Sequence, residues 1–205
     1  MNRITPVVQY LIIINVLMFI GTSPLGQDKL MFALFYPETS YFKPYQLVTH
    51  MFMHGGIAHL LFNMLSLYFL GPMLENLWGP KRFLKYYFIT GLGAAALHLT
   101  VKFVEVHYMG DTSDIYVPVL GASGAIYGVF IAFAMYFPNV QLMLLFPPIP
   151  IKAKYLALGL VAWDLFAGMS NTATSIAHFA HIGGALVGFL VIKYWQMTGQ
   201  KYNRY

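Results

Sequence analysis

The segment from Gly121 to Gly128 places a single serine, Ser123, among small residues where a polar stretch gives way to an apolar one. A nucleophilic serine requires space around its hydroxyl and nearby N–H groups that stabilise the oxyanion formed during attack. Gly121 and Gly124 provide the space, and the first turn of a helix offers N–H groups without intrahelical partners. Small residues in membrane helices more often form packing surfaces, so this segment taken alone favours packing over catalysis.

Two histidines and an asparagine could complete a reactive site with this serine. His181 can act as the general base that takes the serine proton and returns it to the leaving group. His59 and Asn63 can donate hydrogen bonds to the oxyanion, together with the backbone N–H of Ser123. Because Asn63 follows His59 by four residues, the two lie on one face of a helix. These residue types predict serine-based peptide hydrolysis if the fold brings them together.

Small residues and one tyrosine could bring His181 to the serine. Gly184 and Gly188 are four residues apart, a spacing that lets two helices approach closely, and they would face the glycines at positions 124 and 128. Tyr127 lies one turn after Ser123 and could stack on the His181 ring.

The composition indicates a membrane environment. Of the 205 residues, 59% are hydrophobic and only 9% are charged, whereas about a quarter of a soluble domain is charged. The net charge of +5 therefore reflects membrane topology rather than nucleic-acid binding, and no nucleic-acid partner is expected. The chain has no cysteine, which excludes disulfides and thiolate chemistry.

Six apolar segments predict an all-α membrane protein whose single domain, residues 1–205, is a six-helix bundle with a long interfacial first loop. The expected spans are residues 7–20, 56–77, 86–101, 123–137, 155–168 and 177–194. In the first loop, residues 30–37 are too few to span but apolar enough to lie in the interface. A polar connection is expected over residues 102–118, and a stiff, proline-rich turn over residues 147–150.

The distribution of cationic residues predicts the topology. Six spans place both termini and the even-numbered loops on one side, which carries nine cationic residues: Arg3, Lys81, Arg82, Lys85, Lys152, Lys154, Lys193, Lys201 and Arg204. The opposite side carries three: Lys29, Lys43 and Lys102. Both termini are therefore predicted to be cytoplasmic. His59, Ser123 and His181 then fall within about two turns of the outer surface, where buried polar groups are candidates for function.

These residues and their order resemble the rhomboid family of intramembrane serine proteases. The matching motifs are Gly-Ala-Ser-Gly at 121–124 with Tyr127, His-Leu-Leu-Phe-Asn at 59–63, Ala-His-Ile-Gly-Gly-Ala-Leu-Val-Gly at 180–188, and Gly71, Glu75 and Gly79. The resemblance covers essentially the whole chain and matches the bacterial six-span form. It implies that Ser123 is the nucleophile and His181 the base, in a dyad without an acidic third member. It also places His59 and Asn63 in the oxyanion site.

The same resemblance implies substrates and a location. The expected partners are transmembrane protein substrates in the lipid bilayer, cleaved near the extracytoplasmic side without a metal or a cofactor. The expected location is the bacterial inner membrane, and the oligomeric state is left open.

The first loop and two acidic residues require separate interpretation. The first loop of the family often carries a Trp-Arg pair, whereas this chain has Tyr45-Gln46. Because the arginine that would fix the loop is missing, the stiffness of the loop is an open question. Asp164 is the one acid well inside a predicted span, and we interpret it as bonded to a neighbouring helix or reaching water rather than as catalytic. Glu75 is interpreted as a hydrogen-bond acceptor for the turn after the second span.

Two other functions are compatible with parts of the sequence. The pairs His54/His59 and His178/His181 could bind a metal in a transporter or a di-metal enzyme. No Asp or Glu is expected near these histidines at the outer depth, which disfavours a metal site. A non-catalytic rhomboid-like protein that binds client helices is the second alternative. The presence of both Ser123 and His181 favours the protease.

Overall fold

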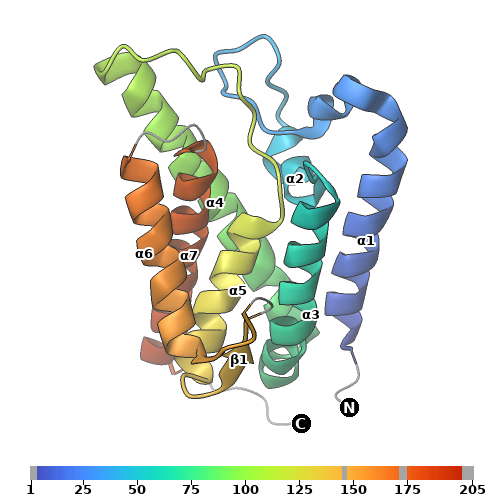
Figure 1. Ribbon diagram of the computed structural model, residues 1–205, viewed down its shortest axis with the longest axis vertical. Coiled ribbons are helices and arrows are strands. Elements are labelled where there is room, and N and C mark those ends of the chain that lie inside the picture. The colour runs from blue at the N-terminus through green and yellow to red at the C-terminus, as the bar shows by residue number, and fades with distance from the viewer. Residues whose placement is uncertain (1–3, 145–146, 171–174, 200–205) are drawn as a thin grey trace.

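The computed structural model describes residues 4–144, 147–170 and 175–199, so that Arg3, Lys201 and Arg204 lie outside the described residues. Six long helices in these ranges run up and down in one bundle (Figure 1). They are α1 (Pro6–Thr22), α3 (Ile57–Trp78), α4 (Pro80–Tyr108), α5 (Ser123–Tyr136), α6 (Ala153–Met169) and α7 (Ser175–Met197). Each helix overlaps one of the six expected spans.

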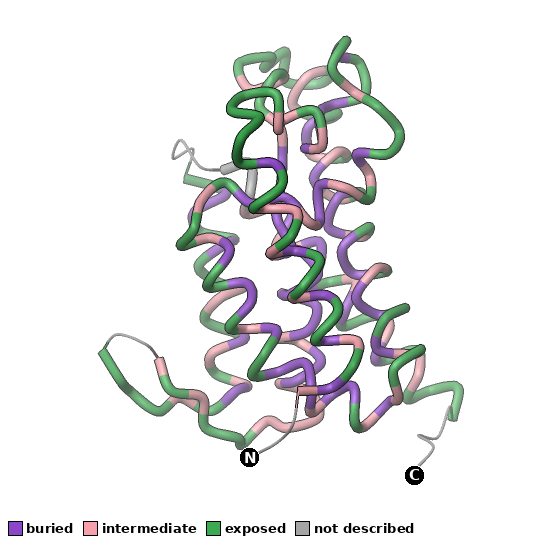
Figure 2. Tube along the Cα trace, turned by 90° about the vertical axis from the view of Figure 1, so that its right-hand side faces the viewer, coloured by how far each residue is buried: buried purple, intermediate pink, exposed green. Residues whose placement is uncertain are grey.

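The bundle presents apolar side chains on its outside. Figure 2 shows the buried residues along the interior of the helices and the exposed ones on the outer faces. Exposed hydrophobic residues occur on several helices and include Leu17, Ile20, Leu61, Phe62, Phe69, Leu158, Phe166 and Leu190. Within the described ranges, the segment Pro6–Phe32, α3 and α4 are long and apolar enough to cross a membrane, and α5 is apolar but shorter. The count of six spans stays a prediction.

Helix α4 is longer than the sequence suggested. The expected span ends at residue 101, but the helix continues to Tyr108. Lys102 is buried, and its Nζ lies 2.8 Å from Oε2 of Glu105, one turn further on. Because an ion pair at this spacing neutralises both charges along the helix, the charged residues do not end it. The expectation that the polar connection starts at residue 102 is therefore wrong: it starts after Tyr108.

The first loop is folded and packs against the segment that leads to Ser123. It contains η1 (Ser23–Phe32), α2 (Gln46–Thr49) and η2 (His50–Phe52). Leu34 and Val119 exchange two backbone hydrogen bonds, of 2.8 and 2.9 Å, and the N–H of Gly121 donates to the carbonyl of His50 at 2.9 Å. Residues 33–36 are buried. The first loop therefore fixes the position of the chain just before the serine.

A single side chain, that of Gln46, links distant parts of this loop. Gln46 is fully buried, and its amide nitrogen donates to the carbonyls of Met31 and Tyr41 at 3.1 and 2.9 Å. Its Oε1 accepts hydrogen bonds from the backbone N–H groups of Phe35 and Lys43, at 3.3 and 3.1 Å. Four hydrogen bonds from one residue thus connect distant parts of the loop without an arginine.

The carboxylate of Glu75 binds the beginning of α1. It accepts hydrogen bonds from the Thr5 hydroxyl at 2.5 Å and from the N–H groups of Val7 and Val8, both at 3.0 Å. An anion is favourable there because the first N–H groups of a helix have no intrahelical partners. Glu75 is thus the acceptor that the sequence predicted, but it serves α1 rather than the turn after α3.

A short hairpin connects α5 to α6. Strand β1 (Gln141–Met143) pairs antiparallel with β2 (Pro150–Lys152), and Met143 lies opposite Pro150. The expected proline-rich turn is therefore part of a hairpin at one end of the bundle (Figure 1).

Candidate active site

Helix α5 begins inside the bundle rather than at its end. Its 14 residues rise only about 21 Å, and a membrane core is about 30 Å thick. The preceding segment descends from the end of the bundle that carries the first loop before the helix starts (Figure 1). Ser123, the first residue of α5, therefore lies below the ends of the neighbouring helices.

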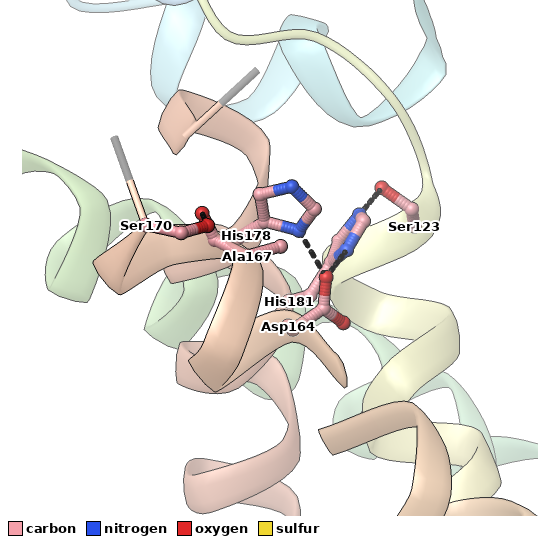
Figure 3. Close-up of polar contacts among 6 residues, drawn as sticks. All are labelled: Ser123, Asp164, Ala167, Ser170, His178 and His181. Carbon is pink, nitrogen blue, oxygen red and sulfur yellow. Dashed lines mark hydrogen bonds and ion pairs between the residues drawn. The ribbon is translucent and has the colours of Figure 1, made fainter. Parts of the chain in front are cut away.

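The structure brings Ser123 and His181 into direct contact. Nε2 of His181, on α7, lies 2.8 Å from Oγ of Ser123, and the two side chains point toward each other (Figure 3). The ring of Tyr127 stacks on the imidazole of His181, with the ring centroids 4.3 Å apart and the planes 10° from parallel. The proximity and the stacking expected from the sequence are both present.

Two pairs of glycines permit this contact. A Cβ added to Gly184 would collide with the backbone carbonyl of Gly124, and one added to Gly188 would lie 2.9 Å from the Cα of Gly128. Helices α5 and α7 therefore approach backbone to backbone, as predicted, and place His181 within reach of the serine.

Gly121 positions the loop next to His59. Its φ of +133° is a conformation that residues with a side chain rarely adopt. A Cβ at this position would lie 2.9 Å from Nε2 of His59 and 3.4 Å from Oγ of Ser123. The ring of His59, on α3, and the hydroxyl of Ser123, on α5, therefore both lie next to Gly121.

Asn63 is buried one turn away from His59, on the same helix. Its amide nitrogen donates to the carbonyl oxygen of His59 at 2.8 Å. This bond orients the amide along α3, and a place for Asn63 in an oxyanion site stays a prediction.

A small cavity of about 20 Å³ lies beside the serine. Gly121, Ser123, Gly124 and His181 contribute to its lining. A cavity of this size holds about one water molecule. The site therefore has room for a water molecule beside Ser123.

Asp164 and His178, which the sequence does not predict as part of the site, also lie in it. Asp164, on α6, is only 1% exposed, and its Oδ1 lies 3.2 Å from Nδ1 of His181. The same oxygen is hydrogen-bonded to Nδ1 of His178 (Figure 3). The expectation that no carboxylate lies near these histidines is therefore wrong. The interpretation of Asp164 as bonded to a neighbouring helix is confirmed.

The sequence carried a partial signal for this cluster. His178 precedes His181 by three residues, so both were expected on one face of the last span. Asp164 was recognised as an acid within a span, but nothing in its own helix indicates which neighbour it faces. The packing of α6 against α7 decides that.

Oδ1 of Asp164 is hydrogen-bonded to Nδ1 of both His178 and His181, and a carboxylate oxygen accepts. This arrangement fixes the tautomer of His181. If Nδ1 carries the ring proton and donates it to Asp164, Nε2 is free to accept the proton of Ser123. The arrangement suits a serine nucleophile with a histidine base that is held from its far side.

Comparison with known proteins gives a consistent result. Residues 41–196 match the model of the rhomboid domain. Rhomboid protease AarA of Providencia stuartii is 30% identical over 151 residues, which cover 69% of this chain and 52% of that protein. Rhomboid protein 1, mitochondrial, of Saccharomyces cerevisiae is 32% identical over 140 residues, which cover 68% of this chain and 38% of that protein. RHOMBOID-like protein 12, mitochondrial, of Arabidopsis thaliana is 32% identical over 151 residues, which cover 69% of this chain and 43% of that protein.

The fold and the site define the class of the protein, which is a helical membrane bundle in which a serine lies next to a histidine. The chain belongs to the rhomboid family, a family of intramembrane proteases, and is an integral membrane protein. The matches span about half or less of the length of these three relatives. The relatives come from a bacterium and from mitochondria, so the family by itself does not specify a bacterial membrane.

Proposed function

We propose that this protein is a serine endopeptidase that cleaves transmembrane segments of other membrane proteins. The observation that carries the proposal is the distance of 2.8 Å between Oγ of Ser123 and Nε2 of His181. This is hydrogen-bond distance between a nucleophile and its general base. The alternative, a protein that binds client helices without cleaving them, gives no reason for this contact.

In the proposed reaction, His181 takes the proton of Ser123 as the hydroxyl attacks the substrate carbonyl. The resulting oxyanion is stabilised by the backbone N–H of Ser123, with His59 and Asn63 as further donors. His181 then protonates the leaving amine, and water hydrolyses the acyl-enzyme by the same steps. The substrate helix must unwind locally, because an intact helix uses its carbonyls in its own hydrogen bonds.

Asp164 has the role of a positioning residue in this proposal. Its contact with Nδ1 of His181 holds the ring in the tautomer that can accept the serine proton, and its charge stabilises the imidazolium that forms. The site is therefore proposed as a Ser-His pair with a carboxylate behind it, rather than the dyad without an acid that the family resemblance implied.

The proposal includes a membrane topology. Six spans with both termini in the cytoplasm place the site near the extracytoplasmic face of the membrane, which we propose to be a bacterial inner membrane. The excess of cationic residues on the side of the termini supports this orientation.

The decisive experiment is labelling of the detergent-solubilised protein with a fluorophosphonate, which reacts with activated serines. We expect labelling of the wild type, and its loss in Ser123→Ala and in His181→Ala. The matched control is Ser66→Ala, which removes a serine on α3 whose hydroxyl bonds to the carbonyl of Phe62. This variant should be labelled like the wild type.

A cleavage assay with a transmembrane peptide in liposomes completes the test. Ser123→Ala should abolish cleavage while thermal unfolding in detergent stays unchanged. Cleavage by Ser123→Ala at the wild-type rate would refute the assignment. A folded wild type that is neither labelled nor active, yet still retains the peptide, would favour the client-binding alternative.

A further inference from the structure

Three side chains of types that can bind a metal converge from two helices on the side of His181 that faces away from Ser123. Asp164 on α6 lies between His178 and His181 on α7, and each of the three offers one ligand atom (Figure 3). These atoms all lie within 4.8 Å of one another. Asp164 is buried, and both histidines are mostly buried. This is a compact cluster that is shielded from solvent, unlike the scattered acidic groups of a protein surface.

The spacing of the ligand atoms suits a tetrahedral transition-metal ion. Zinc binds imidazole nitrogens at about 2.0–2.1 Å and carboxylate oxygens at about 2.0–2.2 Å, so neighbouring ligand atoms are about 3.4 Å apart. Nδ1 of His181 and Oδ1 of Asp164 are already 3.2 Å apart. His178 Nδ1 lies closer to the same oxygen, so a small shift of this ring would admit an ion.

We propose that Asp164, His178 and His181 form a binding site for a divalent transition-metal ion such as Zn²⁺, and that the ion inhibits the enzyme. Two imidazoles and a carboxylate match the ligand preference of zinc, and hard cations such as Mg²⁺ prefer oxygen ligands alone. Three protein ligands leave a fourth position open to water. The inhibitory part of the inference rests on the proposed protease function, and the binding part does not.

Inhibition follows from the two nitrogens of His181. Neutral imidazole carries one ring proton, and the hydrogen bond to Asp164 places it on Nδ1, so that Nε2 can accept the proton of Ser123. A metal bound at Nδ1 takes the lone pair of that nitrogen, and the ring proton moves to Nε2. No proton is gained or lost, but Nε2 becomes a donor and can no longer act as the base.

The ion would also connect two helices. Asp164 belongs to α6 and the two histidines to α7. A shared metal would therefore hold the two helices together more strongly than the hydrogen bonds alone. Binding should therefore raise the temperature of unfolding, which can be measured without any substrate.

The binding test uses the Ser123→Ala variant, which retains all three ligands and lacks the nucleophile. After treatment with a chelator, the protein is titrated with Zn²⁺ by calorimetry and with Co²⁺ by visible absorption, which reports tetrahedral coordination. We expect one ion per chain and a higher unfolding temperature. Adding His178→Gln or Asp164→Asn should weaken binding more than about a hundredfold, since loss of outer-shell partners alone costs 10–100-fold.

A matched control removes a histidine that is paired with an acid but, among the described residues, belongs to no three-ligand cluster. His107 Nε2 lies 2.8 Å from Oε1 of Glu38 on the exposed part of the molecule. His107→Gln should leave the stoichiometry and the affinity unchanged. Binding that His178→Gln leaves intact, or no binding and no tetrahedral Co²⁺ spectrum in Ser123→Ala, would overturn the site.

The activity test is separate. Wild-type cleavage should fall as Zn²⁺ is added and return with a chelator. Specific binding to Ser123→Ala together with full wild-type activity at saturating Zn²⁺ would overturn the inhibition. Specific binding to a wild type that never cleaves would refute the proposed protease and with it the inhibition, while the metal site would stand.

Discussion

His181 is held on three sides by residues from two other helices. Nε2 meets Ser123 and the ring face meets Tyr127, both on α5, and Nδ1 meets Asp164 on α6. A general base is effective when its ring cannot rotate and its proton is on the correct nitrogen. These contacts fulfil both conditions in the absence of substrate.

Asp164→Asn should lower kcat of the proposed protease by about tenfold to a hundredfold. The estimate follows from a hydrogen bond to a charged group, which contributes about 1.5–3 kcal/mol, and from about tenfold in rate for each 1.4 kcal/mol. KM should change little, because Asp164 acts on His181 and not on the substrate. Initial rates of transmembrane-peptide cleavage, measured with a chelator present, give both constants.

Two further variants separate positioning from general stability. Asp164→Glu retains the charge and should recover part of kcat. Asp111→Asn removes an exposed acid in the outer loop, whose carboxylate accepts a hydrogen bond from the N–H of Ser113, and should leave both constants unchanged. A loss in Asp164→Asn that appears only in KM would contradict the positioning role.

At the scale of elements, the distance between α5 and α7 decides whether the site forms. The close approach at Gly124 and Gly184 leaves no space for a side chain. The hydroxyl of Tyr86 on α4 also donates to the carbonyl of Gly128 at 2.7 Å, which ties a third helix to α5. The geometry of the candidate site is therefore a consequence of helix packing.

Gly184→Ala should destabilise the protein by about 1–3 kcal/mol, the usual cost of overpacking, and reduce labelling of Ser123 by a fluorophosphonate. The added methyl would push α7, and His181 with it, away from α5. Gly159→Ala in α6 is the matched control, since a Cβ there meets nothing within 4 Å. The control should be neutral or stabilising by up to about 1 kcal/mol. Equal thermal stability of the two variants would contradict this account.

The first loop depends on a single buried amide. Gln46→Ala removes four hydrogen bonds and should destabilise the loop by about 2–6 kcal/mol, at about 0.5–1.5 kcal/mol each. The expected readouts are faster proteolysis within residues 23–52 and a lower unfolding temperature in detergent. Gln27→Ala, in the same loop but exposed, should leave both unchanged. A Gln46→Ala loop as resistant as the wild type would show that other contacts hold it.

At the scale of the whole molecule, the chain is well suited to a test of topology because it contains no cysteine. Ser113 lies in the exposed loop between α4 and α5, and Asn139 is exposed between α5 and β1. In intact cells, a membrane-impermeant maleimide should label Ser113→Cys, and it should label Asn139→Cys only after the membrane is permeabilised. The reverse labelling pattern would place the termini on the extracytoplasmic side and the candidate site near the cytoplasmic side, opposite to the proposed topology.

The sequence determined the helices and most of the site. The apolar segments set the six long helices, because any span of backbone in a lipid environment must satisfy its own hydrogen bonds. The motifs around Ser123 and His181 pointed to the two residues that the structure brings into contact, and the small residues at 124, 128, 184 and 188 indicated which helix faces would touch. These signals are local or have fixed spacing, so they can be read without a structure.

The tertiary structure decided which polar residues meet across helices. Asp164 and Glu75 each have a carboxylate that could bond in many directions, and only packing assigns one to His181 and His178 and the other to the start of α1. Gln46 is similar, since its four partners are brought to it by the fold of the loop. A buried polar group that has no hydrogen-bond partner costs free energy, so the fold must bring a partner to it. That partner can come from any part of the chain, and the position of the residue in the sequence does not reveal it.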